Sequence, residues 1–498
     1  MVETLARSAK FSLLSSCETL EEKMATIRIL PALYMLLNLI NLSLLGVIPS
    51  TSYANVGDMF GFGARTASLA GADVAGGFDG YAAYSNPASL ARPQVKRLVL
   101  SYGIQYAQPV FMDISGVLVQ NNFNSDADTY GNVDTSYKST FGQSVGLSYR
   151  LFPEFHDFTF GVVTFLPLIQ TAYMDSGETY VPEYLLYRSR SQRPQFEFGF
   201  GSSVGNGFHV GLGLHMAFSL TSNATVFLQA NPARASSMRF TSTLKPKLSP
   251  YIGFLFIEPT EEQKYSAGIV VRAPVSSPNA MVLNSGARVL GNFAALDFNF
   301  KANSALYYDP GTIELGGVIK TGPRERTLVQ LDYQFWHLFQ SPALIIENPS
   351  ITQCTDPISS QCNPPGITIS PTLSPTLNLR NILIPRIAEE LTFEKLVLRF
   401  GYAYRPSIFS GPPTEVGNML DPSKHILNAG VGFQFKKFLD YDVPCTIDLN
   451  VSYHQLVSQT VTKSPGNETG AAGSKVGSPG YTAGGRIFAS GVALTMAF

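Results

Sequence analysis

The sequence is poor in charged residues, cysteine and tryptophan, and these shortages exclude several classes of protein. Charged residues make up 14% of the 498 residues, against about 25% in an average soluble domain. The net charge is −1, so the chain lacks the basic balance of a nucleic-acid-binding protein and no nucleic-acid partner is expected. After residue 54 no apolar run is long enough for a transmembrane helix, so none is expected there.

Glycine and aromatic residues are abundant instead, with 43 Gly, 23 Tyr and 34 Phe. Polar and apolar residues alternate in many segments; in residues 95–107, Leu98, Tyr102 and Tyr106 fall on one face. Many of these segments have the length of about ten residues that a tilted membrane strand needs. The pattern is typical of an all-β transmembrane antiparallel β-barrel, whose lipid-facing residues occupy alternate positions. A β-sandwich or a soluble barrel is the alternative, but the outward Leu, Val, Phe and Tyr argue against both.

The alternation predicts strands along most of the chain. Gly205-Asn206-Gly207 lies between two of them and is typical of a hairpin turn. The last strand ends on Phe498 and resembles the terminal signal by which outer-membrane barrels are recognised for assembly. The predicted strands are Val95–Ala107, Phe141–Leu151, Phe158–Leu166, Gln195–Val204, Phe208–Leu220, Ala224–Ala230, Met238–Lys245, Tyr251–Phe256, Lys264–Arg272, Ser285–Val289, Phe293–Ala302, Ile313–Lys320, Leu328–Trp336, Leu396–Arg405, His425–Phe435, Thr446–Leu456 and Arg486–Phe498.

Residues 1–54 are predicted to be a leader and a cleaved signal peptide. A short basic region after Met24 precedes an apolar run at 29–48, and small residues end the segment at Ala54. Cleavage is expected after Ala54, and Met24 is the expected true start, because translation from Met1 adds a polar leader. The alternative is a retained membrane anchor, since the apolar run is long for a signal.

Residues 55–94 are predicted to be an N-terminal hatch, and residues 95–498 the transmembrane β-barrel. Residues 61–91 are rich in Gly and Ala and carry few charges. Small residues allow tight packing, and a wide barrel has a lumen to fill. The alternative is an ordinary loop, which Gly-rich composition alone favours. A nucleotide site is excluded because no Gly-Lys-Ser/Thr follows the glycines.

The four cysteines and six histidines form no recognisable metal or catalytic site. Cys354 and Cys362 lie close together in a polar, Pro-rich segment and are a possible disulfide in an exported protein. Cys445 has no assigned role. His209 and His215 share one face of a strand but are too far apart for one metal, so they are expected in the lumen or at an interface. No nucleophile motif frames a serine, so we expect neither an enzyme nor a cofactor.

Several aromatic and basic residues have two interpretations. Tyr102, Tyr106, Phe111, Tyr402 and Tyr404 could line an apolar binding site, but an interfacial girdle is the favoured interpretation for each. Trp336, the only Trp, is expected to be an interface anchor. Arg65 and Arg92 flank the predicted hatch and could meet a fatty-acid carboxylate. Pairing with an aspartate of the hatch is preferred.

The N-terminal stretch resembles the hatch of the FadL-type outer-membrane transporters of long-chain fatty acids and other hydrophobic compounds. The matching residues are Gly63-x-Arg65, the run 67–72, and Asn86-Pro87-Ala88 with Leu90. Looser matches to the family's strands follow in the same order over most of the mature chain, at 158–167, 265–274, 330–336, 398–404 and 420–430. The resemblance implies about 14 strands, fewer than the alternation predicts. An insert at about 341–385 departs from the family.

The resemblance also implies the function, which is passive uptake of long-chain fatty acids or other hydrophobic compounds through a hatch-plugged barrel in the outer membrane of a Gram-negative bacterium. Outer-membrane lipid and lipopolysaccharide are the expected surroundings, and the sequence does not determine the oligomeric state. The rival hypothesis is an outer-membrane interaction or secretion-partner barrel without transport activity. Asn86-Pro87-Ala88 is expected to form a turn at the end of the hatch, because Pro87 restricts Asn86 and turn Asn residues bond nearby backbone. The alternative is an ordinary surface turn.

Overall fold

The computed structural model describes residues 62–93, 97–120, 128–133, 135–152, 157–169, 182–187, 193–229, 237–288, 295–337, 345–354, 377–413, 417–436, 443–463 and 480–498. The predicted leader, signal peptide and cleavage site therefore lie outside the described residues, as does Cys362. Among the described residues, no helix is long and apolar enough to cross a membrane.

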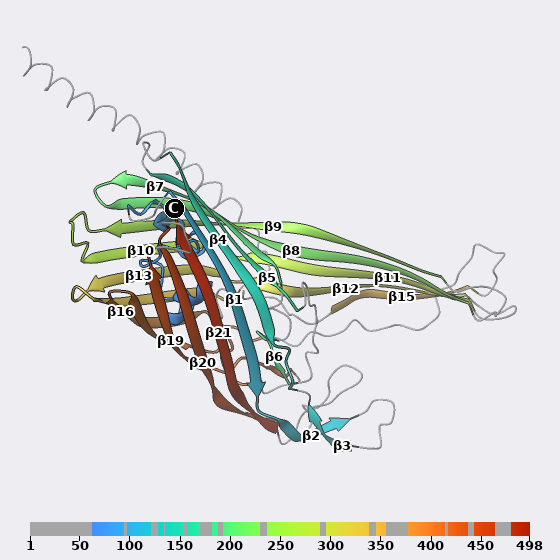
Figure 1. Cartoon of the computed structure of the whole chain (residues 1–498). Helices are drawn as coiled ribbons and strands as arrows, with labels where there is room; N and C mark the ends of the chain where they lie inside the picture. Colours follow the sequence, from blue (N-terminus) through green and yellow to red (C-terminus); the bar gives the residue numbers. More distant parts are fainter. Residues whose placement is uncertain are drawn as a thin grey trace, which may run out of the picture. The chain divides into compact units, whose positions relative to one another are not determined.

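Fourteen of the described strands form a closed antiparallel β-barrel (Figure 1). Each strand pairs with the next barrel strand along the chain, and β1 pairs with β21 to close the ring. This confirms the predicted fold class and strand number. The barrel strands are β1 (Leu98–Phe111), β4 (Thr140–Phe152), β5 (Phe158–Pro167), β7 (Gln195–Gly205), β8 (Phe208–Gln229), β9 (Ser237–Ile257), β10 (Tyr265–Arg272), β13 (Gly311–Lys320), β14 (Glu325–Phe335), β16 (Ile382–Phe393), β17 (Leu396–Arg405), β19 (Lys424–Phe435), β20 (Cys445–Thr462) and β21 (Gly480–Ala497).

Most strands lie within a few residues of their predicted positions, and β17 matches its prediction at both ends. The turn between β7 and β8 is also confirmed, with positive φ at Gly205, Asn206 and Gly207. Four predicted strands form only two in the structure. The predicted strands at 208–220 and 224–230 are both part of β8, and those at 238–245 and 251–256 are both part of β9. The predicted insert is too long at its C-terminal end, since β16 begins at Ile382 and carries Pro385 within the barrel wall.

Alternation along the strands gives the barrel two different faces. Large apolar residues point outward and are exposed in the isolated chain, as at Tyr102, Phe200, Leu315 and Val451. Inward positions are almost fully buried, and many of them hold small, polar or charged residues. An apolar outside and a polar inside are the reverse of a soluble protein and are the arrangement of a transmembrane barrel.

Strands β8 and β9 continue beyond their barrel neighbours and join a larger sheet. Residues 221–229 of β8 pair in parallel with β11 (Val275–Arg288), which pairs with β12 (Ala295–Asp309), and β12 pairs with β15 (Ile345–Cys354). Figure 1 shows these five strands running together. Two small sheets lie in the other connections: β2 (Ile114–Gln120) with β3 (Asp128–Val133), and β6 (Glu183–Tyr184) with β18 (Met419–Leu420).

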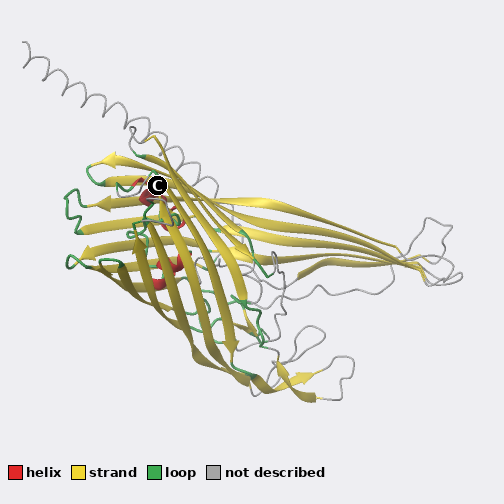
Figure 2. Ribbon diagram, viewed as in Figure 1, coloured by secondary structure: helices red, strands yellow, loops and turns green. Residues whose placement is uncertain are grey.

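Residues 62–93, here called the interior segment, lie against the inner face of the barrel. They contain the short helices α3 (Gly63–Ser68) and α4 (Ala82–Ser85) and the 3₁₀-helix η1 (Pro87–Ala91), which Figure 2 shows among the barrel strands. Almost every residue of the segment is buried, and Phe78 is an exception at 37% exposed. Since its side chains are mostly small, the segment can approach the wall closely.

Candidate functional site

Glycines of the barrel wall make room for the interior segment. A β-carbon at Gly211 would lie 2.3 Å from the backbone nitrogen of Ala88, and one at Gly401 would lie 2.6 Å from the backbone nitrogen of Ala70. Contacts this short cannot exist, so any side chain at these positions would displace the segment. Wall glycines in similar contact with the segment occur on strands all round the barrel: Gly146, Gly161, Gly199, Gly201, Gly211, Gly253, Gly268, Gly316, Gly401 and Gly430. The segment is therefore surrounded by the wall.

A buried network of charges joins α3 to three neighbouring strands. Arg65 donates to Asp73 at 2.8 Å, which confirms the expected pairing within the segment. Its Nε also lies 3.5 Å from Glu390 on β16. Glu390 accepts hydrogen bonds from Arg326 on β14 and Arg399 on β17, both at 2.7 Å. One carboxylate thus holds three guanidinium groups, one from the segment and two from the wall.

Other wall side chains bond to the backbone carbonyls of the segment. Arg386 donates to the Ala70 carbonyl at 2.5 Å, and Arg272 to the carbonyl of Tyr84. Arg92 of the segment also donates to a carbonyl, that of Ala75, rather than to an aspartate as expected. These bonds satisfy one carbonyl of α4, that of Tyr84, and two carbonyls outside the helices, those of Ala70 and Ala75.

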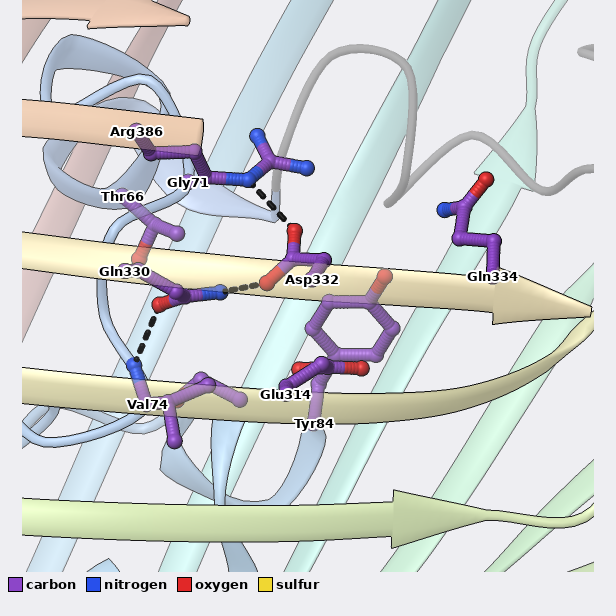
Figure 3. Close-up of a pocket in the computed structure, with 10 residues that line it drawn as sticks. Thr66, Gly71, Val74, Tyr84, Glu314, Gln330, Asp332, Gln334 and Arg386 are labelled. Atoms are coloured by element: carbon purple, nitrogen blue, oxygen red, sulfur yellow. Dashed lines mark hydrogen bonds and ion pairs between the residues drawn. The ribbon is translucent and has the colours of Figure 1, made fainter. Parts of the chain in front are cut away.

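A small polar cavity lies between the segment and the wall (Figure 3). Asp332 is at its centre and accepts bonds from Arg386 at 2.6 Å and Gln330 at 2.7 Å, while Gln330 accepts from the Val74 nitrogen. The cavity has a volume of about 30 Å³, enough for one or two water molecules but not for a hydrocarbon. This cavity therefore has no room for an apolar ligand.

Asn86 forms the bonds expected of a turn residue and one further bond to the wall. Its side-chain oxygen accepts from the Ala88 nitrogen at 3.0 Å. Its amide nitrogen donates to the carbonyls of Val74 at 2.9 Å and of Phe254 on β9 at 3.1 Å. Pro87 begins η1, where its missing N–H costs nothing. Asn86-Pro87-Ala88 therefore links two parts of the segment and a barrel strand.

The end of the barrel where β1 finishes is covered by an apolar cluster, here called the cap. Phe111 at the end of β1 stacks on Tyr184 of β6, with ring centroids 3.9 Å apart. The Tyr184 hydroxyl donates to the Gly484 carbonyl at 2.8 Å, and burial raises its pKa to about 12. The cap is built around the β6–β18 sheet and includes Ile114, Tyr137, Leu185, Leu186, Tyr187, Tyr308, Trp336, Ile382, Ile408, Phe409, Met419, Leu420, Leu456 and Tyr481.

Lys424 is a buried lysine beside the cap. It is 1% exposed, and its Nζ donates to the Tyr187 hydroxyl at 2.9 Å. The neighbouring Asp421 pairs with Arg405 at 2.9 Å instead. Within the described part of the chain no carboxylate forms an ion pair with Lys424. Charging a buried lysine that lacks an ionic partner is costly, so an anionic ligand group at this position would stabilise the charged form.

Two aromatic residues expected at the membrane interface lie inside. Trp336 is fully buried in the cap, where its indole N–H donates to Gln334 at 2.9 Å, so the interface-anchor prediction is wrong. Phe111 is likewise in the cap and not in a girdle. Tyr102, Tyr106 and Tyr402 are exposed on the outside, at 45%, 41% and 37%, as the girdle interpretation predicts.

The two singled-out histidines are lumenal and do not meet. His215 contacts Glu197 and lies 3.0 Å from Asp309, which also pairs with Arg193. His209 is buried on the same inward face of β8. Cys445 is buried and free, and the predicted disulfide of Cys354 with Cys362 stays a prediction. Among the described residues no cluster of His, Cys, Asp or Glu is placed to hold a metal ion.

A closed barrel with an apolar outer face and a polar interior is the architecture of outer-membrane proteins. The fold is similar to that of a FadL homologue from Pseudomonas aeruginosa, with a TM-score of 0.51 and 12% identity over 88% of this chain and 98% of that one. It is similar to the same degree to the toluene transporter TodX of Pseudomonas putida, with a TM-score of 0.51 and 12% identity over 89% and 99% of the two chains. No protein-family model and no curated protein matches the sequence. The likeness confirms the fold that the FadL resemblance implies.

Proposed function

We propose that the protein is a FadL-type channel of the Gram-negative outer membrane, which takes up hydrophobic compounds passively, with residues 62–93 as its hatch. The observation that carries the proposal is a barrel whose interior is occupied by its own N-terminal segment and covered by an apolar cap. The similarity in fold to a FadL homologue and to a toluene transporter supports it.

The cap suits an apolar ligand and not a hydrated solute. An apolar molecule gains free energy by leaving water for an apolar site, at about 25 cal/mol per Å² buried. A water-filled pore would offer it nothing, since both ends of the path are aqueous. The small cavity beside Asp332 is consistent with a closed route for ions.

Lys424 favours long-chain fatty acids over neutral hydrocarbons as the substrate class. A carboxylate could bond to the buried Nζ of Lys424 while the acyl chain lies among the apolar side chains of the cap. A neutral aromatic compound would use the apolar surface alone.

The test is ligand binding to the purified mature protein. We expect saturable binding of a fluorescent long-chain fatty acid, about tenfold weaker in a Lys424→Met variant because a charged hydrogen bond contributes about 1.5–3 kcal/mol. Toluene binding should be unchanged by that variant, and Lys264→Met, at an exposed turn, should change neither. Absence of saturable binding of both ligands, or a large ion conductance in planar bilayers, would contradict the proposal. Equal loss of both ligands in Lys424→Met would contradict only the assignment of the substrate.

A further inference from the structure

The hairpin of β8 and β9 has a free edge beyond the barrel. Strand β7 pairs with β8 as far as Met216, and β10 pairs with β9 as far as Tyr251. Residues 237–248 of β9 pair with β8 on one side, and no described strand pairs with their other side. Pro246 lies in this stretch and lacks the N–H that a further strand would need. The edge is therefore unsuited to pairing with a second copy of the chain.

The two faces of this edge have different chemistry. Met238, Phe240, Leu244 and Leu248 continue the outward row of β9 and are 69%, 56%, 60% and 61% exposed. Alternate positions carry cations, and Lys245 and Lys247, on either side of Pro246, are both exposed. No acidic side chain in the described part of the chain pairs with either lysine, and residues 237–250 contain no Asp or Glu.

The height of these lysines can be worked out from the strand geometry. A strand rises about 3.4 Å per residue, and a tilt of about 40° leaves roughly 2.6 Å of height per residue. The apolar band of an outer-membrane barrel is about 25 Å tall, which takes about ten residues. Counted from Phe256 near the β9–β10 turn, the band ends near Pro246. Lys245 and Lys247 therefore stand at the level of lipid headgroups, with Leu248 just inside the acyl region.

We propose that this edge of β9 binds lipopolysaccharide. Its acyl chains cover Leu248, and its lipid A phosphates bind Lys245 and Lys247. The lysine stems are long enough to turn round the unpaired edge towards phosphates on the outer side. Two neighbouring cations that pair with no described acidic side chain match the closely spaced phosphates of one lipid A better than the single charge of a phospholipid. The proposal rests on the outer-membrane location proposed above and is independent of transport.

The test is native mass spectrometry of the mature barrel titrated with lipid A. We expect lipid A to bind about thirtyfold more weakly to a Lys245→Gln/Lys247→Gln variant, which corresponds to about 1 kcal/mol for each lysine. Dephosphorylated lipid A should bind both proteins alike. The matched control is Lys395→Gln/Lys436→Gln, two exposed lysines at the opposite end of the barrel, which should bind lipid A as the wild type does.

Each contrary result overturns the proposal in a recognisable way. Equal lipid A binding by the wild type and the variant would show that Lys245 and Lys247 do not bind lipid A. An equal loss with phosphatidylglycerol shows a general anionic-lipid site and not one for lipopolysaccharide. A change in oligomeric state without a change in lipid A binding assigns the edge to a contact between copies. Heat-modifiable gel mobility checks that the variant barrel has folded. Uptake of a hydrophobic ligand is measured separately, so that loss of lipid A binding is distinguished from failure of the proposed transport function.

Discussion

Replacing Glu390 by glutamine should loosen the interior segment without unfolding the barrel. The carboxylate of Glu390 is buried between the guanidinium groups of Arg65, Arg326 and Arg399. Glutamine keeps the size of the side chain and removes its charge. Arg65 would keep its bond to Asp73, but it would lose its ionic contact with the wall.

The size of the effect follows from the number of partners. Removing one member of a buried ion pair costs about 3–5 kcal/mol. The lower value applies because Arg399 keeps Asp448 at 2.5 Å as a second partner, as Arg65 keeps Asp73. Only one of the three arginines belongs to the segment, so its share is about 1 kcal/mol. The equilibrium constant for local opening of α3 should therefore rise about fivefold, because 1.4 kcal/mol corresponds to a tenfold change in an equilibrium constant.

Hydrogen exchange of residues 62–69 in the purified barrel measures that opening directly. The matched control is Glu389→Gln, the same chemical change one position along β16, where the carboxylate accepts from Thr327 and faces the other way. We expect faster exchange and more small-solute leakage in liposomes for Glu390→Gln, and neither for Glu389→Gln. Equal exchange in the two variants would refute the idea that Glu390 holds the segment.

Three further predictions concern other contacts of the chain. Asn86→Ala/Pro87→Ala should keep barrel assembly and raise leakage, because the bond to Phe254 is lost; unchanged leakage and uptake would show that the motif does not hold the segment. Gly401→Val should displace Ala70 and destabilise the folded barrel by about 1–3 kcal/mol in urea unfolding, whereas Gly317→Val, whose nearest neighbour is a side chain 3.5 Å away, should cost much less. Thiol alkylation of the denatured, unreduced mature protein should label Cys445 alone, and labelling of Cys354 would exclude the predicted disulfide.

Most strands could be predicted because their outward residues are apolar at every second position, even in β17, which carries the inward Arg399 and Arg405. β16 was missed because its inward side carries Arg386 and Glu390 next to the outward Glu389, with Pro385 between Ile384 and Arg386. In sequence this combination is typical of a loop. In the barrel each inward charge has a partner on a neighbouring strand or on the segment, so the strand tolerates it.

The charged network could not be predicted for a related reason. Arg65 and Glu390 are more than three hundred positions apart, and their meeting depends on how the segment lies inside the closed wall. Local spacing indicated only the contact of Arg65 with a nearby aspartate. Trp336 was misplaced because a single aromatic at the end of a strand fits an interface and a lumenal cap equally well in sequence. The cap itself is assembled from loops and strand ends that lie far apart in sequence. The alternation of polar and apolar residues does not indicate which of them come together.

Apolar packing and hydrogen bonds together hold the interior segment against the wall. Phe62 and Leu90 are fully buried in a cluster with Phe165 of the wall, and Leu69 is buried in a second cluster with wall residues. Wall side chains also bond to its carbonyl groups, as Tyr251 does to Ala83 at 2.7 Å and Ser266 to Ala75 at 2.9 Å. Each bond of this kind contributes about 0.5–1.5 kcal/mol, and water can replace it where the boundary is already polar. Displacing the segment would therefore break these bonds and the apolar contacts, but not the hydrogen bonds between the strands of the wall.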